Sequence, residues 1–97
     1  MKGYVIVEVE VSDKERYEEY KKLAAESIAF YGGKYLVRSV ESEMLEGEWH
    51  PQRIVVLEFP SKERAKEWWN SEMYAKPKKI RNQTAKSKMI VVDGYDD

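Results

Sequence analysis

The sequence predicts an α+β fold with the element order strand, helix, strand, strand, helix, strand. Residues 4–11, 34–43 and 53–59 show either apolar residues at every second position or a run of β-branched residues, as strands do. Two other stretches repeat apolar residues at helical spacing. This order is typical of a ferredoxin-like βαββαβ domain, in which a four-stranded antiparallel sheet carries both helices on one face.

The first strand is expected over residues 4–11, because four valines share one of its faces: Val5, Val7, Val9 and Val11. Ser12 and Glu15 have the spacing of a capping box, which marks the start of a helix. The helical repeat then continues until Gly32, a residue type that commonly ends helices. The first helix is therefore expected over residues 13–31.

The second strand is expected over residues 34–43, with Tyr35 on one face and Arg38 on the other. Residues 45–51 are rich in turn formers and lead into the β-branched run of residues 53–59. The two strands are therefore expected to form a hairpin with a long loop.

The second helix is expected to begin after Ser61, which is placed to cap it. Residues 70–71 are expected to interrupt this helix, and a further helical stretch follows over residues 73–86, with Pro77 tolerated in its first turn. The last strand is expected over residues 88–95.

Two helices cover only one face of such a sheet, yet the third strand is apolar on both of its faces. A bare apolar sheet face is larger than the patches that soluble monomers normally show. A second copy of the chain, packed sheet against sheet, is the simplest cover. The sequence therefore predicts a homodimer.

Length and composition bound the classes of function. The 97 residues, 42% of them hydrophobic, suit a single domain over residues 1–97. The chain has no cysteine, which excludes disulfides, thiolate metal sites and a cysteine nucleophile. The lack of cysteine, together with the lack of a visible targeting segment, favours the cytoplasm. No apolar run approaches the roughly 20 residues that span a bilayer. The net charge of −1 argues against electrostatic binding of nucleic acid.

Several segments, spread over nearly the whole chain, together resemble one known family. They are Gly3-Tyr4, the run from Tyr31 to Arg38, Leu45-Glu46-Gly47 with Trp49 and Pro51, Glu58-Phe59-Pro60-Ser61, Trp68 with Ser71-Glu72 and Tyr74, and Val91-Val92-Asp93-Gly94. This pattern resembles the bacterial domain of unknown function 1330. That family belongs to the dimeric α/β barrel superfamily, with antibiotic-biosynthesis monooxygenases, haem-degrading enzymes and muconolactone isomerases. The resemblance implies two sheets packed face to face across a dimer axis, and it supplies no reaction.

Arg38 and Glu58 are the first candidates for catalytic residues. With the usual strand order 4-1-3-2, both are expected on the uncovered sheet face together with Glu8. A guanidinium beside carboxylates can bind a substrate carboxylate or hold a general base. The same three residues also fit a structural ion network inside the dimer, and both interpretations stay open.

His50 is the third catalytic candidate and the single histidine of the chain. As a loop imidazole beside Trp49 it can act as an acid or base near neutral pH, or have no catalytic role. No second ligand stands at a diagnostic spacing from it, so no metal site is expected.

Five aromatic residues are candidates for a substrate pocket between sheet and helices: Tyr35, Trp49, Trp68, Trp69 and Tyr74. Ordinary core packing is the alternative. Trp68 and Trp69 are adjacent on a helix, so one of them must point to a different side. In haem-degrading relatives a haem-ligating histidine stands where this chain has Lys78, so the resemblance argues against haem, and no cofactor is expected.

A basic cluster spreads around the second helical segment: Lys76, Lys78, Lys79, Arg81, Lys86 and Lys88. We interpret it as a solvated helix face, with attraction of an anionic ligand or of nucleic acid as the alternative. Because acidic residues elsewhere balance this charge, no nucleic-acid partner is expected.

Together these observations predict a homodimeric ferredoxin-like protein of the dimeric α/β barrel type. We expect a cofactor-independent enzyme of oxygenase or isomerase type, or a binder, with a cavity for a small aromatic or carboxylated ligand between sheet and helices. The alternatives are a non-catalytic dimerisation or ligand-sensing module, and an engineered scaffold built on this family. An engineered origin would explain the surface rich in Lys and Glu.

Overall fold

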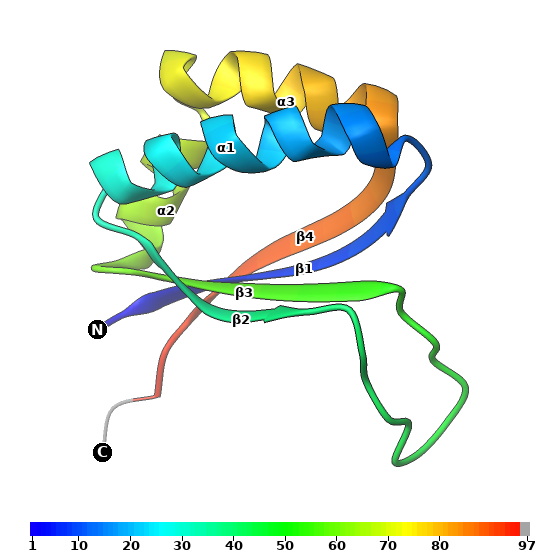
Figure 1. Ribbon diagram of the computed structural model, residues 1–97. Coiled ribbons are helices and arrows are strands. Elements are labelled where there is room, and N and C mark those ends of the chain that lie inside the picture. Colours follow the sequence, from blue (N-terminus) through cyan, green and yellow to red (C-terminus); the bar gives the residue numbers. More distant parts are fainter. Residues whose placement is uncertain (96–97) are drawn as a thin grey trace.

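The computed structural model describes residues 1–95 and confirms the predicted α+β class and order of elements. The elements are β1 (Gly3–Val11), α1 (Lys14–Phe30), β2 (Lys34–Ser39), β3 (Arg53–Phe59), α2 (Lys62–Trp69), α3 (Glu72–Thr84) and β4 (Ala85–Asp93). Figure 1 shows the three helices together on one side of a single sheet. None of these helices combines the length and the apolar character that crossing a membrane requires.

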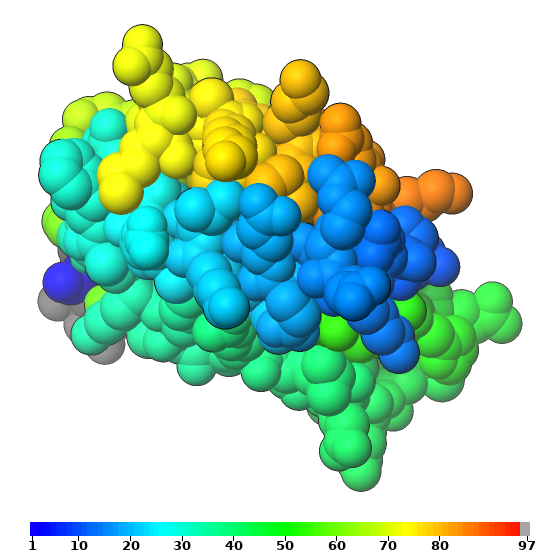
Figure 2. All heavy atoms as spheres, turned by 45° about the horizontal axis from the view of Figure 1, so that its top comes forward, coloured from blue at the N-terminus to red at the C-terminus, as the bar shows by residue number. Residues whose placement is uncertain are grey.

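The sheet has the strand order β2-β3-β1-β4 and is antiparallel throughout, as the ferredoxin-like arrangement requires. Because β1 is central, its valines are covered by the helices, and they form the base of the core. Phe59, Trp68 and Tyr74 fill the layer above them. Figure 2 looks onto this helical layer and shows α1 and α3 lying side by side.

The helix starts were predicted with one error. Asp13, not Ser12, caps α1, because its side chain accepts the backbone N–H of Arg16 at 3.2 Å. The Ser12 hydroxyl instead donates to the carbonyl of Thr84 at 3.0 Å, which ties the start of α1 to the end of α3. Ser61 caps α2 as predicted.

In the second half of the chain, the starts of α3 and β4 differ from the prediction. The interruption expected at residues 70–71 does separate α2 from α3, but Pro77 lies beyond the first turn of α3. β4 begins directly after α3, at Ala85 instead of residue 88. The reason is that the Thr84 carbonyl accepts N–H groups from the chain just before α1.

β2 contains a β-bulge that the alternation of its sequence does not reveal. Tyr35 pairs with Leu57, but Val37 pairs with Val56, so Leu36 is an extra residue without a partner across the strand. An extra residue reverses the side to which every later side chain of the strand points.

Arg38 consequently pairs with Val55 and faces the helices. Glu8 and Glu58 lie on the opposite, uncovered face, next to outward-facing residues of their strands. The predicted meeting of Arg38 with these two carboxylates is therefore wrong.

The sheet face opposite the helices is uncovered in this chain. Its exposed apolar side chains are Ile6, Leu36, Val37, Ile90 and Val92. β2 ends at Ser39 rather than at residue 43, and the loop of residues 40–52 projects from that end of the sheet on the uncovered side (Figures 1 and 2). We call the sheet face opposite the helices the open face.

Candidate functional site

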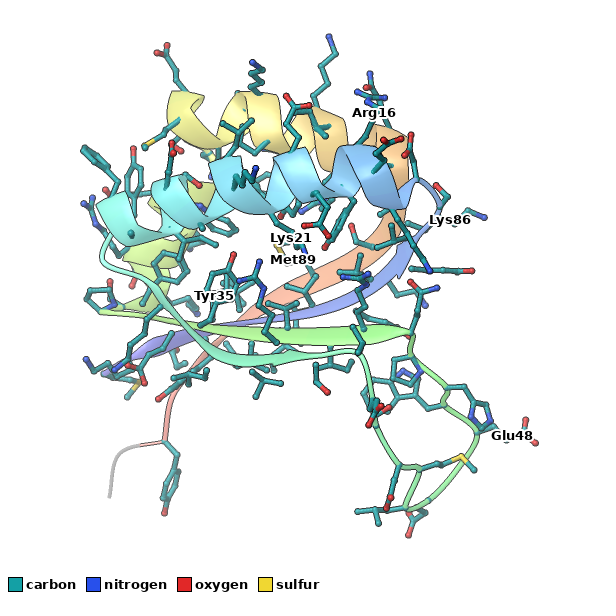
Figure 3. The ribbon with its side chains drawn as sticks, viewed as in Figure 1. Arg16, Lys21, Tyr35, Glu48, Lys86 and Met89 are labelled. Carbon is teal, nitrogen blue, oxygen red and sulfur yellow. The ribbon has the colours of Figure 1, made fainter. Side chains whose placement is uncertain are left out.

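A cavity of about 260 Å³ lies between α1, β2 and the helix-covered face of the sheet, and we call it the α1–β2 cavity. Figure 3 shows Tyr35 pointing from β2 toward the helices, with Lys21 and Met89 in the layer between helices and sheet. Small-molecule sites usually have volumes of about 300–1,000 Å³, so this cavity lies just below that range and suits only a small ligand.

The walls of the α1–β2 cavity are apolar and aromatic. Its apolar lining comes mainly from the sheet, with Val7, Val9, Val55, Leu57 and Met89, and also includes Ile28 and Val40. Aromatic rings from α1, α2 and β2 complete it: Tyr17, Tyr20, Trp68 and Tyr35. Such a lining favours a flat, largely apolar ligand.

Three positively charged side chains line this cavity, namely Lys21, Arg38 and Arg53. The Arg38 guanidinium lies 4.5 Å from the centre of the Tyr35 ring, and that of Arg53 lies 5.2 Å from the Tyr17 ring. Neither arginine forms an ion pair within residues 1–95, and no acidic residue lines the cavity. Outside the lining, Glu18 pairs with Lys21 at 2.9 Å. The cavity thus presents an excess of positive charge.

The phenols around the cavity are held in their neutral form. Burial raises the pKa of Tyr17 to about 12, and burial also raises the pKa values of Tyr20, Tyr35 and Tyr74. The Tyr20 and Tyr74 hydroxyls are 2.8 Å apart, and Arg81 Nη1 donates to the Tyr74 oxygen at 2.8 Å. At neutral pH these phenols are therefore hydrogen-bonding groups and not nucleophiles or bases.

This arrangement can hold an anion and stabilise negative charge. Charge-assisted hydrogen bonds from arginine are stronger than neutral ones, particularly where water is partly excluded. The cavity lining includes no carboxylate and no imidazole, the usual general bases. Within the described residues, no group of three His, Asp or Glu side chains is placed to hold a metal ion. The geometry accordingly favours anion binding over proton abstraction.

The five predicted pocket aromatics are dispersed by the fold. Tyr35 and Trp68 line the α1–β2 cavity, and Tyr74 lies behind it, reached through the Tyr20 hydroxyl. Trp68 is 1% exposed, whereas Trp69 is 41% exposed and does not line the α1–β2 cavity, which confirms that the two rings diverge. Trp49 lies on the open face and outside any such pocket, where its indole N–H donates to Glu8 Oε2 at 3.1 Å.

The three catalytic candidates are not brought together. Arg38 lines the α1–β2 cavity, but Glu58 lies on the open face, where it accepts the Tyr4 hydroxyl at 3.0 Å and contacts Lys34 at 3.4 Å. His50 is exposed in the loop of residues 40–52 and does not line this cavity. Within one chain these three residues therefore lie at separate places.

The aromatic and charged lining residues Tyr17, Tyr20, Lys21 and Arg53 were not predicted from the sequence. A signal for Arg53 was present, since it shares the strand face of Leu57 and is a charge in an otherwise apolar row. The tyrosines were recognised only as the apolar side of a helix. That they border a cavity depends on the distance between α1 and β2, which periodicity does not encode.

Solved structures with the same fold cover nearly the whole chain. RPA0582, a protein of unknown function from Rhodopseudomonas palustris, has a TM-score of 0.80 at 20% identity, over 99% of this chain and 84% of that protein. The cofactor-independent oxygenase SnoaB from Streptomyces nogalater has a TM-score of 0.67 at 8% identity, over 99% and 95% of the two chains. A candidate antibiotic biosynthesis monooxygenase from Nitrosomonas europaea has a TM-score of 0.61 at 16% identity, over 97% and 98%. At these identities the likeness establishes the fold alone.

The sequence itself assigns the family. No curated protein matches the chain significantly. The family described as a domain of unknown function, DUF1330, matches residues 2–95, which is nearly the entire chain and agrees with the resemblance in its motifs. The chain belongs to the DUF1330 family.

Proposed function

We propose that this domain is a homodimer that binds a small aromatic anion in the α1–β2 cavity. The observation that carries the proposal is the charge of the lining, which includes Lys21, Arg38 and Arg53 and no acidic residue. Unpaired guanidinium groups beside an apolar cavity are stabilised when an anion enters.

The position of the charges defines the ligand. Arg38 and Arg53 each lie against a tyrosine ring, so a ligand ring that packs beside Tyr35 or Tyr17 brings its anionic group near a guanidinium. A benzoate or a phenolate has the required shape and charge. The volume of about 260 Å³ restricts the ligand to one or two rings.

The homodimer is supported by the open face. Five apolar side chains lie exposed there, and Trp49 of the projecting loop adds a sixth apolar surface beside Glu8. A contiguous apolar surface of this kind is typical of an interface. A self-complementary sheet face packs against its own copy about a twofold axis.

A second candidate function is cofactor-independent oxygenation of the bound anion. The fold shared with SnoaB favours it, and the three cations would stabilise the substrate in its reactive anionic form. An isomerase is less well supported, because moving a proton within the substrate requires a base, and neither a carboxylate nor an imidazole lines the cavity.

Binding is tested by thermal unfolding with 4-hydroxybenzoate and its neutral analogue 4-hydroxybenzamide. The acid at about 100 times its dissociation constant should stabilise the protein by about 2.7 kcal/mol, and the amide much less. Arg53→Met should weaken the effect of the acid at least tenfold in affinity, because it removes a charged hydrogen bond. Arg64→Met is the matched control, since Arg64 also lies on a tyrosine ring, Tyr31 at 4.5 Å, but outside the cavity.

Equal stabilisation by acid and amide would contradict the anion site, and so would equal responses of the two arginine variants. Oxygen consumption, measured with an electrode in the presence of the acid, separates the two candidate functions. Binding without oxygen uptake leaves a binding or ligand-sensing module, whereas uptake that Arg53→Met abolishes supports the oxygenase.

The homodimer is tested by analytical ultracentrifugation. Ile90→Glu places a charge among the apolar side chains of the open face, on the edge strand β4, and should convert the dimer to a monomer. Met73→Glu is the matched control, because Met73 is an exposed apolar residue on the helical side, and this variant should stay dimeric. A wild-type chain that sediments as a monomer at all concentrations would contradict the proposal.

A further inference from the structure

Arg81 is buried without an anionic partner. It was interpreted from the sequence as part of a solvated basic face, and this is wrong, since Arg81 is only 6% exposed. Its Nη1 donates to the Tyr74 hydroxyl at 2.8 Å, and its Nη2 makes a long contact of 3.4 Å with Asn82 Oδ1. Its Nε is buried and has no hydrogen-bond partner.

A guanidinium in this position is unusual on physical grounds. It remains charged at all accessible pH values, so it cannot neutralise itself by losing a proton. Buried charges are normally paired with an opposite charge, because removing them from water is costly. None of the ion pairs among residues 1–95 includes Arg81, so its counter-charge is not supplied by the described part of the chain.

Arg81 lines a second cavity, of about 490 Å³, which we call the α2–β4 cavity. Its walls come from α2, α3, β1 and the edge strand β4, and it shares Trp68 and Met89 with the α1–β2 cavity. Its own apolar and aromatic lining is formed by Val5, Ala65, Trp69, Ile90 and Val91. Its polar lining consists of Lys66, Asn70, Arg81 and Ser87, with no acidic residue.

A further positive charge stands close to this cavity. The Lys78 ammonium lies 3.5 Å from the centre of the Trp69 ring, and Trp69 is one of the walls. Burial and the positive charge of Arg81 lower the pKa of Lys78. The two cations therefore repel each other.

We propose that the α2–β4 cavity is a second binding site, which takes a hydrophobic monocarboxylate with its carboxylate on Arg81. The single buried guanidinium of this lining matches one negative charge. The apolar walls around Trp68, Trp69 and Met89 accept the body of the ligand.

This site does not depend on the function proposed for the α1–β2 cavity. Arg81 does not line that cavity, and neither Arg38 nor Arg53 lines this one. Trp69 and Asn70 line only the α2–β4 cavity, so signals from these two residues report on it alone.

The test is a titration of the ¹⁵N-labelled full chain with 1-naphthoate, followed by NMR. The indole N–H of Trp69 and the side-chain amide of Asn70 should shift in a saturable manner. The neutral analogue 1-naphthamide should bind at least about tenfold more weakly at these two reporters, because it has no charge to pair with Arg81. This comparison uses the unaltered protein and does not depend on any variant folding correctly.

Two variants locate the charge that is responsible. Arg81→Met should weaken the naphthoate response of Trp69 and Asn70 at least about tenfold, since the guanidinium is lost. Arg53→Met, the matched control in the other cavity, should leave that response unchanged. The proposal is overturned if the two reporters show no saturable shift, if the amide binds them as tightly as the acid, or if Arg81→Met leaves the affinity unchanged.

Discussion

The two faces of the sheet are formed by the same strands, but the charged side chains on them differ in their partners. On the helix-covered face, Arg38 and Arg53 point into a cavity and have no ion-pair partner within residues 1–95. On the open face, Glu8 accepts the Trp49 indole, and Glu58 accepts the Tyr4 hydroxyl and contacts Lys34. Charges whose hydrogen-bonding partners come from their own chain need no ligand, whereas unpaired cations beside a cavity attract one.

This difference indicates which kind of partner suits each face. The covered face contains an apolar cavity whose two arginines form no ion pair within residues 1–95, so it suits a small anion. The open face has its carboxylates engaged and lacks packing, so it suits another apolar surface. Four measurements test this difference between the covered face and the open face.

The largest expected effect is the loss of Trp68 from the covered face. Its ring centre lies 4.2 Å from that of Tyr74 and 5.4 Å from that of Phe59, and its indole N–H donates to Ser27 Oγ at 2.9 Å. Trp68→Ala should lower the free energy of unfolding by about 3–5 kcal/mol, as measured by urea denaturation. Trp69→Ala is the control and should cost clearly less, because Trp69 is 41% exposed. Similar losses for both would mean that α2 is rotated relative to the sheet.

The next effect compares one apolar residue from each face. Val9 is buried under the helices, so Val9→Ala should cost about 2 kcal/mol at any protein concentration. Ile90 is 58% exposed in the single chain, so Ile90→Ala should cost little when the protein is dilute. If the open face is a dimer interface, that cost should rise with concentration as the dimer forms. A cost of Ile90→Ala that is the same at all concentrations would argue that the open face has no partner.

The sequence predicts the fold well where alternation and caps are local properties. The valines of β1 and the cap Ser61 are examples, and both lie where they were expected. The bulge at Leu36 was not predictable, because it is defined by pairing with β3 and leaves no trace in the order of apolar and polar residues. One extra residue then moved Arg38 from the open face to the cavity, so the largest error in the site follows from one local irregularity.

The candidate site was less predictable because it depends on distances between elements. Arg81 is seven residues after the buried Tyr74, a spacing that places both on one side of a helix and offered a usable signal. The five neighbouring lysines of the basic cluster obscured it. Trp49 was misplaced for another reason, since a loop residue has no periodicity from which its contacts follow.

A smaller effect concerns alkaline pH and the covered face. The pKa of Tyr17 is raised by burial to about 12, whereas an exposed phenol has a pKa near 10. Between these values the unfolded chain has lost the phenolic proton and the folded chain still holds it, so stability falls as the pH rises. Tyr17→Phe should reduce this fall by up to about 1.4 kcal/mol per pH unit between pH 10 and 12, measured by urea denaturation. A fall that is equally steep in the variant would place the Tyr17 phenol in solvent.

The smallest expected effect concerns acid pH and the open face, and it has the opposite sign. The hydrogen bond from Tyr4, together with Lys34, lowers the pKa of Glu58. The ionised form is therefore favoured by folding, and its contribution is complete above the ordinary carboxyl pKa and lost as the pH falls through the lowered value. Glu58→Gln should make stability fall less steeply below about pH 4.5, with Glu46→Gln in the loop as a control for the loss of one negative charge. Because Glu58 lies on the open face, the same variants measured above and below the dissociation constant of the dimer show whether this contribution is a property of the single chain or of the interface. The stability of the Glu58→Gln variant could instead fall with pH as steeply as that of the wild type at both concentrations. That result would mean that the Glu58 carboxylate is held in place without contributing to stability.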